Sequence, residues 1–325
     1  MFTDFHSSRF QYTFGPHPPT VRIEPKSTLR VTCPDSDGAF SDLRVLGPDQ
    51  QQTDPDMDIL QANPLAGPIH IEGARRGDVL AVTIDEVELD RRKGQTWLGP
   101  GHGLLPEHLV APRGDGSAGP DPVVPRQMYH WDIDPQAGIA TVTNPLGDVP
   151  IVIRLDPFVG CIGVCPKSGQ AISSLHSGSF GGNLDLPLVR PGTTVFLPIF
   201  HDGALLLLGD VHAAQGHGEI IGGGIETSGK IICTVDVFKK QAITAGRIWD
   251  GKRLWAIMAG CARPCGWRIR TCSTGSLRLE SSIALTFTIS SARQPIWYRA
   301  TCSSHRTRWQ LEFGTMICRP RCVRS

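Results

Sequence analysis

The chain has 325 residues, of which 40% are hydrophobic and 19% are charged, and its formal net charge is +1. This composition indicates a packed globular protein of one large or two ordinary domains, and it excludes an intrinsically disordered chain. The sequence has no run of about 18 apolar residues and no basic segment followed by an apolar one at its N-terminus. We therefore expect a cytoplasmic protein without a membrane span.

The 36 glycines and 26 prolines favour many turns and short strands over long helices. Apolar and polar residues alternate in Val21–Cys33, where a turn at Pro25 and Lys26 predicts a hairpin. They alternate again in Val79–Leu89, after a turn at Arg76–Asp78. We expect an α+β fold that is predominantly β, with few helices and with mixed or antiparallel sheets or a barrel-like sandwich.

Polar side chains gather in Leu205–Ser228, which reads LLLLGDVHAAQGHGEIIGGGIETS. The apolar residues Leu205 to Leu208 predict a buried strand that ends at Gly209 and leads into a glycine-rich loop. The polar residues of this segment are Asp210, His212, Gln215, His217, Glu219 and Glu226. Such a loop lets the backbone approach a metal ion or a substrate, although its spacing also fits a solvated turn.

A second polar group lies upstream, in SGSFGGNLD. Asn183 and Asp185 are two residues apart, so on an extended segment their side chains point to the same face. Asp210 and His212 have the same spacing. An amide beside a carboxylate fits a bound cation or an amide substrate, but the spacing equally allows an Asx turn in which both side chains bind local backbone N–H groups.

Cys161 and Cys165 form a C-x3-C pair without a second Cys or His pair at zinc-finger spacing. We predict that both are small buried hydrophobic side chains. A catalytic Cys, as in nitrilase-type amidases, would need a Glu-Lys-Cys constellation in an α/β sandwich, which this sequence does not show. The loop-like residues 91–121 include Trp97 and His102, which are candidates for a lid or a pocket wall.

Three segments in the same order resemble the acetamidase/formamidase family. GDVHAAQGHGEI followed by IETS resembles its signature, which is close to GD-x-HAAQGDGE with IE shortly after. Gly181–Asp210 resembles its GGN-x-D segment and the strands that follow, and Asn63–Ile84 resembles its GP-x-x-VEGA-x-x-GD-x-L-x-V segment. The resemblance covers about residues 10–245. His217 stands where the family usually has Asp.

The resemblance implies hydrolysis of a short aliphatic amide, formamide or acetamide, to ammonia and a carboxylate. It also suggests a divalent metal ion, Zn²⁺, and a homo-oligomer. From the sequence itself we expect neither a nucleic acid nor a membrane as a partner. The site residues expected from the resemblance are Asp185, Asp210 and His212 as metal ligands, Asn183 and Gln215 as groups that hold the substrate amide or oxyanion, and Glu219 as general base with Glu226 second. The alternative is an inactive metal-binding β protein, or a truncated or frameshifted amidase remnant.

Residues 246–325 differ from the rest of the chain in their charge. They hold 14 Lys and Arg and 3 Asp and Glu, whereas residues 1–245 hold 18 Lys and Arg and 28 Asp and Glu. Six of the ten Cys also lie there. No paired C-x2-C spacing or aromatic platform supports a zinc-binding or nucleic-acid-binding tail. We expect a family domain over residues 1–245, with two β subdomains at about 1–155 and 156–245 as an alternative division, followed by a tail that a frameshift has put out of frame.

Overall fold

The computed structural model describes residues 2–42, 44–47, 49–52, 61–98, 127–144, 147–257, 270–271 and 277–278. Every regular element within these ranges is a β-strand. The prediction of a predominantly β protein is therefore confirmed, whereas the described residues contain no helix that would support the α+β label. None of these residues forms a helix long and apolar enough to cross a membrane.

The first sheet has seven strands. Their order is β1 (Phe2–Phe5), β5 (Ser27–Cys33), β20 (Gly229–Phe238), β8 (Val79–Leu89), β17 (Thr193–Pro198), β21 (Arg247–Trp249) and β22 (Leu254–Ala256). Only β1 and β5 are parallel, and the other neighbours are antiparallel. β5 alternates buried and partly exposed residues, as its sequence pattern predicts, because successive side chains of a strand point to opposite faces.

The second sheet has thirteen strands. Its main path is β12 (Ile151–Arg154), β11 (Ile139–Val142), β10 (Gln127–Asp134), β9 (Lys93–Leu98), β19 (Glu226–Thr227), β18 (Leu206–His212), β13 (Phe158–Gly163), β16 (Gly181–Asn183) and β15 (Ser177–Gly178). β7 (Leu65–Ile71) also pairs with β18 and joins β2 (Phe10–Gln11), β4 (Val21–Ile23) and β6 (Gln51–Gln52) to the sheet. Two separate pairs are β3 (Thr13–Phe14) with β14 (Ile172–Ser173), and β23 (Arg270–Thr271) with β24 (Leu277–Arg278).

Among the described residues, one large hydrophobic core joins the two sheets. It contains Val31 of β5 and Val82 of β8 from the first sheet, and Ile69 of β7 and Leu208 of β18 from the second. All seven residues of β18 are buried, as expected for a strand that is covered on both faces. β18 is therefore the central strand on which the polar residues after Leu208 are mounted.

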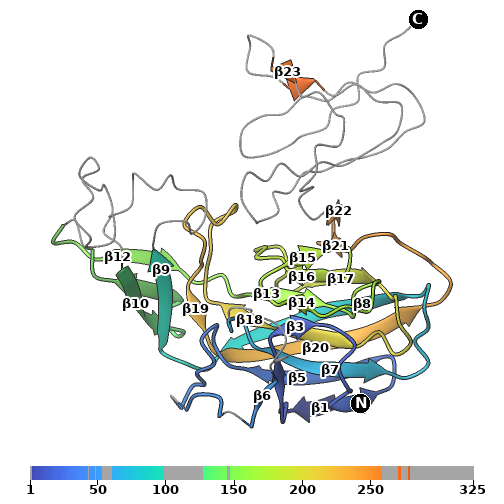
Figure 1. Ribbon diagram of the computed structural model, residues 1–325. Coiled ribbons are helices and arrows are strands. Elements are labelled where there is room, and N and C mark those ends of the chain that lie inside the picture. The colour runs from blue at the N-terminus through green and yellow to red at the C-terminus, as the bar shows by residue number, and fades with distance from the viewer. Residues whose placement is uncertain are drawn as a thin grey trace, which may run out of the picture.

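A smaller hydrophobic cluster supports the other end of the second sheet, where β9, β10 and β12 lie beside β19 (left in Figure 1). Its buried members are Ile133, Ala140, Ala213, Ala214 and Ile225. Ala213 and Ala214 directly follow β18, and Ile225 directly precedes β19. The cluster therefore anchors the chain on both sides of the glycine-rich segment.

Two predictions about local structure are wrong. The expected hairpin at Val21–Cys33 does not form, because β4 pairs in parallel with β7 of the second sheet while β5 belongs to the first. The turn at Pro25 and Lys26 instead connects the two sheets, and Lys26 has a φ of 66°. The apolar strand also continues past Gly209 to His212, so the polar signature begins on a strand and not in a loop.

The two sheets take strands from both sides of residue 155. β5 and β8 alternate with β20 and β17 in the first sheet, and β7 lies beside β18 in the second. β21 and β22, which lie after residue 245, complete the edge of the first sheet. Ile248 of β21 is fully buried in the core, so the packed structure extends beyond residue 245.

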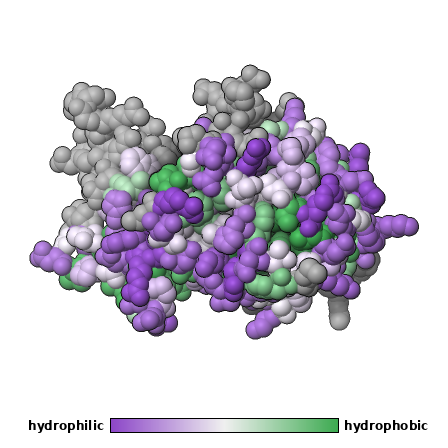
Figure 2. Space-filling model, turned by 90° about the horizontal axis from the view of Figure 1, so that it is seen from below, coloured by the Kyte–Doolittle hydropathy of each residue, from purple (hydrophilic) through white to green (hydrophobic). Residues whose placement is uncertain are grey.

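Figure 2 shows a face on which hydrophilic side chains predominate and hydrophobic ones form smaller areas between them. Large hydrophobic side chains that are exposed among the described residues lie on several separate elements, and they include Phe2, Val45, Val149, Ile220 and Phe238. Scattered exposure of this kind is normal on protein surfaces. It does not by itself define an interaction site.

Asp78 stabilises the turn before β8. Its carboxylate accepts hydrogen bonds from the backbone N–H groups of Arg75 and Lys240, both at 2.9 Å, and from Lys239 Nζ at 3.0 Å. Burial would raise the pKa of Asp78, but the hydrogen bonds from Lys240, Lys239 and Arg75 lower it. A lowered pKa stabilises the fold above the unfolded Asp pKa of about 3.9, and this contribution is lost as the pH falls through the folded value.

We expect Asp78→Ala to lower the free energy of unfolding by about 1–3 kcal/mol, because it leaves two backbone N–H groups without their acceptor. Urea denaturation at neutral pH measures this loss. The difference between the variant and the wild type should shrink as the pH is lowered below about 4, where the wild-type carboxylate becomes protonated. A difference that stays constant across this range would contradict the assignment.

Candidate functional site

The predicted site residues meet at the end of β18. In the pairing of β13 with β18, Val159 lies opposite Val211 and Cys161 opposite Gly209, so Gly160 faces Asp210. β19 pairs with the same end of β18 and sets Glu226 opposite His212. β16 lies on the other side of β13 and ends at Asn183. Three neighbouring strand pairs therefore bring distant parts of the sequence to one place.

The potential ligand atoms form two overlapping groups. One atom each from Asp185, His212 and Glu219 lies within 4.8 Å of the others, and the same is true of Asp210, His212 and Glu226. Asp210 and His212 are each 1% exposed, and Asp185 and Glu219 are each 6% exposed. The Glu226 side chain is 14% exposed. His212 thus lies at the centre of four carboxylates that are almost removed from water.

Gly160 provides the space into which these side chains point. A Cβ atom at this position would lie 2.3 Å from Asp210 Oδ2, 2.7 Å from His212 Cε1 and 2.9 Å from Asp185 Oδ1. The Gly160 carbonyl accepts backbone hydrogen bonds from Leu184 at 2.8 Å and Asp185 at 3.2 Å. The three predicted metal ligands therefore surround one point, and any larger residue at position 160 would occupy it.

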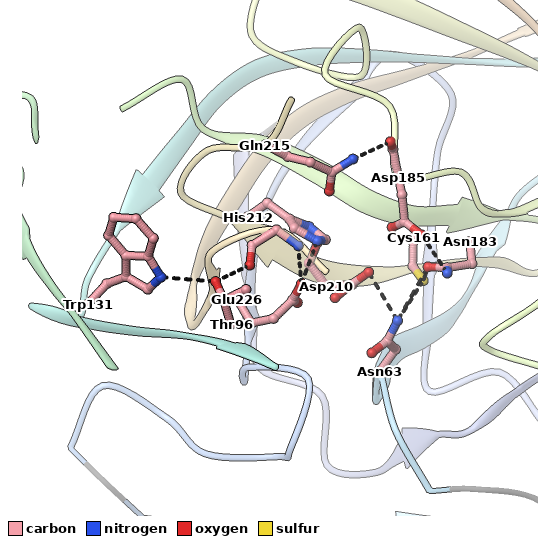
Figure 3. A network of polar contacts seen from close by, with 11 residues as sticks. Asn63, Thr96, Trp131, Cys161, Asn183, Asp185, Asp210, His212, Gln215 and Glu226 are labelled. Atoms are coloured by element: carbon pink, nitrogen blue, oxygen red, sulfur yellow. Dashed lines mark hydrogen bonds and ion pairs between the residues drawn. The ribbon is translucent and has the colours of Figure 1, made fainter. Parts of the chain in front are cut away.

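The imidazole of His212 is held by several contacts (Figure 3). Its Nε2 lies 2.8 Å from Glu226 Oε1, and its Nδ1 lies 3.3 Å from the Asp210 carbonyl oxygen. The ring stacks on Phe158, with centroids 4.8 Å apart and planes 14° apart. A Cβ at Gly224 would lie 2.3 Å from His212 Cδ2. These contacts leave the ring little freedom to rotate.

The strands β9 and β10 hold the segment that carries Glu226 (Figure 3). Trp131 Nε1 donates a hydrogen bond to Thr96 Oγ1 at 2.9 Å, and Thr96 Oγ1 donates to the Gly224 carbonyl at 2.6 Å. The Gly224 N–H in turn donates to Glu226 Oε1 at 3.1 Å. Glu226 is therefore fixed both by strand pairing and by this chain of hydrogen bonds.

Burial and the neighbouring charges shift the pKa values of the ionisable groups in this cluster. Burial raises the pKa of Asp185 well above its usual range, and the charges of Glu219 and Asp210 raise it further. Burial also raises the pKa of Asp210, with His212 opposing and Glu226 adding to the shift. For His212, burial would lower the pKa, but Glu226 and Asp210 raise it well above the usual value. The pKa of Glu226 would be raised by burial, but His212 lowers it.

Apart from the imidazole of His212, no described cationic side chain is paired with Asp185, Asp210 or Glu226. Among the described residues, Asp185, Asp210 and Glu226 make no ion pair with a Lys or Arg. Buried like charges are stable only if they take up protons or lie next to a cation. The cluster is therefore suited to a positively charged ligand.

Several buried atoms support a metal site more directly. Asp185 Oδ1, Asp210 Oδ1 and Gln215 Oε1 are buried, and no described residue gives them a hydrogen bond. Such atoms are uncommon in folded proteins and call for a missing partner. Carboxylate oxygens with one imidazole are donors that Zn²⁺ and other divalent ions accept. The residues present therefore fit a divalent metal ion.

Each residue of the predicted site lies in this network. Gln215 Nε2 donates to the Asp185 carbonyl at 2.7 Å, and Asn183 Nδ2 donates to Asp185 Oδ2 at 2.6 Å. His217 is exposed and belongs to neither ligand group. The loop predicted for residues 91–121 is wrong for Lys93–Leu98, which form β9 and include Trp97, whereas His102 and the rest of residues 99–121 lie outside the described residues.

Cys161 and Cys165 are buried free thiols, as predicted. Burial raises the pKa of Cys165 to about 11. Burial, together with the charges of Asp210 and Asp185, raises the pKa of the Cys161 thiol well above its usual value. Cys161 Sγ donates to Asn183 Oδ1 at 3.0 Å, so it lies against the site but is held as a neutral thiol.

Sequence reasoning missed Asn63, Phe158, Gly160 and Thr96. Asn63 begins a segment that resembles the family, but its Nδ2 reaches Asp210 Oδ2 across 147 positions of the sequence at 3.1 Å. Gly160 looks like any other glycine of a buried strand, and Thr96 like any other polar strand residue. Only the pairing of the strands shows that these side chains share one site.

The sequence matches a model of a known family. Residues 14–171 and 168–249 match the model described as the Acetamidase/Formamidase family. The chain belongs to this family. The resemblance in the three sequence segments is thereby confirmed, and the matched range includes all the predicted site residues.

Individual members support the assignment. An acetamidase from Mycolicibacterium smegmatis is 24% identical over 274 residues, which cover 70% of this chain and 66% of that protein. The crystal structure of a predicted acetamidase/formamidase from Thermoanaerobacter tengcongensis has a TM-score of 0.61 at 29% identity and covers 79% of this chain and 76% of that one. An acetamidase from Yersinia enterocolitica has a TM-score of 0.63 at 27% identity, covering 82% and 76%. The chain spans only 61–66% of the length of the curated relatives it matches.

We expect Gly160→Ala to abolish measurable binding of Zn²⁺ in calorimetric titration, because the added methyl group occupies the point where Asp185, Asp210 and His212 converge. The overpacking should also lower the free energy of unfolding by about 1–3 kcal/mol. Gly216→Ala is the matched control, since a Cβ there meets no atom within 4 Å. Wild-type affinity for Zn²⁺ in a folded Gly160→Ala variant would show that this point is not the metal position.

Proposed function

We propose that this protein hydrolyses short aliphatic amides, formamide or acetamide, to ammonia and a carboxylate, and that it does so with a divalent metal ion, for which Zn²⁺ is the first candidate. The observation that carries the proposal is the convergence of Asp185, Asp210 and His212 on one point above Gly160, in a chain of the acetamidase/formamidase family. The names of its relatives support the choice of substrate.

Asp185, Asp210 and His212 would hold the ion. Their buried oxygens without partners and the concentration of negative charge support this assignment. A bound divalent ion would polarise the amide carbonyl and lower the pKa of a water molecule. The protein contributes by fixing the ligands on paired strands and by excluding bulk water, since low exposure strengthens electrostatic interactions.

Glu219 is the proposed general base. It lies on the loop after β18, with one carboxylate oxygen within 4.8 Å of ligand atoms of Asp185 and His212. It would take a proton from the water whose oxygen attacks the carbonyl carbon, and would then give that proton to the nitrogen as the C–N bond breaks. Ammonia leaves and the carboxylate remains. Glu226 is already bonded to His212 and Gly224, which favours a role in orienting the imidazole.

Gln215 is the proposed substrate-binding residue. Its Nε2 is bonded to the Asp185 carbonyl, which fixes the side chain, while its buried Oε1 has no partner among the described residues. This oxygen would accept a hydrogen bond from the N–H of a primary amide and orient it. Asn183 was expected to share this task, but both ends of its side chain are bonded to protein groups.

We expect purified protein to release ammonia from formamide or acetamide after addition of Zn²⁺, and to lose this activity when the metal is removed by a chelator. Metal analysis should detect bound metal in the active, Zn²⁺-treated protein and none in the chelator-treated protein. Bound metal without turnover would instead support the alternative of an inactive metal-binding β protein. Turnover that survives complete removal of the metal would refute the metal-dependent mechanism.

The roles of two carboxylates are separable. We expect Glu219→Gln to keep its affinity for Zn²⁺ but to lower kcat by about 10²–10⁴-fold, the usual contribution of a general base. Asp210→Asn should instead lose affinity for Zn²⁺. Glu86→Gln, an exposed change on β8, is the control and should leave both properties unchanged. Full activity of Glu219→Gln would refute its role as the base.

A homo-oligomeric state, a cytoplasmic location and an out-of-frame origin of residues 246–325 remain predictions. The last of these is tested by resequencing the locus. A single-base insertion or deletion near the codons for residues 246–258 would support a frameshift. A continuous frame that encodes the printed sequence would contradict it.

A further inference from the structure

A chain of side-chain amides connects the two aspartates on either side of the site (Figure 3). Asn63 Nδ2 donates to Asp210 Oδ2 at 3.1 Å and to Asn183 Oδ1 at 3.3 Å. Asn183 Nδ2 then donates to Asp185 Oδ2 at 2.6 Å. The order Asp210–Asn63–Asn183–Asp185 will be called the amide bridge.

The amide bridge uses one oxygen of each carboxylate and leaves the other without a partner. Oδ2 of Asp185 is bonded to Asn183, while its Oδ1 has no partner among the described residues and lies beside the point above Gly160. In Asp210, Oδ2 is bonded to Asn63 and is also the oxygen that lies at the point above Gly160, while Oδ1 has no partner among the described residues. The bridge thus fixes the rotation of both carboxylates with respect to each other.

Asn63 is itself held rigidly. The residue is 8% exposed, and its backbone N–H donates to the Ser36 carbonyl at 2.9 Å. It lies two residues before β7, whose Leu65 pairs with Gly209 of β18. Its φ of 53° lies in the left-handed region, which Asn tolerates better than other residues with a Cβ. The pairing of β7 with β18 therefore places the amide next to Asp210.

We propose that Asn63 and Asn183 are positioning residues, and that the amide bridge orients Asp210 and Asp185 for the ligand that binds between them. Asn183 cannot easily serve the substrate as well, because its Oδ1 accepts from Asn63 and Cys161 and its Nδ2 donates to Asp185. In metal sites, partners of this kind tune the affinity of the ligands that they hold. This inference rests on the proposed metal-dependent function.

The first test replaces Asn63 by Gly, which removes the amide and still allows a positive φ. Zn²⁺ affinity should fall by about 10–100-fold, the usual effect of losing such a partner. At saturating Zn²⁺, the KM for acetamide should stay near the wild-type value, because Asn63 does not touch the substrate. Gln51→Ala is the control, since among the described residues the Nε2 of Gln51 donates to the Leu46 carbonyl and to no group of the site. Wild-type Zn²⁺ affinity in folded Asn63→Gly would overturn the proposal.

A double-mutant cycle tests whether the two amides act together. Asn183→Ala alone should lower the affinity for Zn²⁺ about as much as Asn63→Gly does. The affinity of the double variant should fall by less than the product of the two single fold-changes, because either change breaks the same bridge. If the fold-change in Zn²⁺ affinity of the double variant equals the product of the two single fold-changes, the two amides act independently and the proposal is overturned. A raised KM at saturating Zn²⁺ in Asn183→Ala alone would show that Asn183 contacts the substrate.

A measurement without metal separates this proposal from the proposed function. In metal-free protein, Asn63→Gly should shift the ¹H–¹⁵N NMR signal of the Asn183 side-chain amide, because its hydrogen-bond partner is lost, while Gln51→Ala should not. An unchanged Asn183 signal would overturn the bridge whatever the activity. A shifted signal in a protein that neither binds Zn²⁺ nor releases ammonia would support the bridge and refute the proposed function.

Discussion

The constraint on which this structure depends is the burial of like charges. Asp185, Asp210, Glu219 and Glu226 surround a single imidazole, and all are largely removed from water. The cost of burying such charges is met only by protons, a cation or specific hydrogen bonds. The backbone N–H of Gly224 and the side chains of Asn63 and Asn183 supply part of this compensation, and the buried oxygens without partners among the described residues are where the proposed cation would bind.

The fold meets this constraint mainly with paired strands, while Asp185 and Glu219 lie on the segments that follow β16 and β18. β18 carries Asp210 and His212, β13 offers Gly160 opposite Asp210, and β19 brings Glu226 opposite His212. Asp210 has a φ of 62° within the strand, a conformation that costs free energy for a residue with a Cβ. Strained backbone is retained where the surrounding structure demands it, and it is often found at functional sites.

The side chains of the site divide into those that face the central point and those that hold them. Phe158 stacks on the imidazole, Gly224 bonds Glu226, and the Trp131–Thr96 pair fixes Gly224. Side chains that are held by such contacts need little reorganisation when a ligand binds. The same division separates the proposed task of Gln215, whose buried Oε1 has no partner among the described residues, from that of Asn183, which is bonded at both ends.

The sequence by itself determined the predominantly β class, the buried strand over Leu206–Leu208 and the gathering of polar residues after it, because alternation and glycine-rich signatures are local properties. It did not reveal that Val21–Cys33 splits between two sheets, or that Gly160 and Asn63 belong to the site. Those facts depend on which strands pair, and β7, β13 and β18 are far apart in the chain. Strand pairing is a non-local interaction, so only the tertiary structure decided how the predicted residues meet.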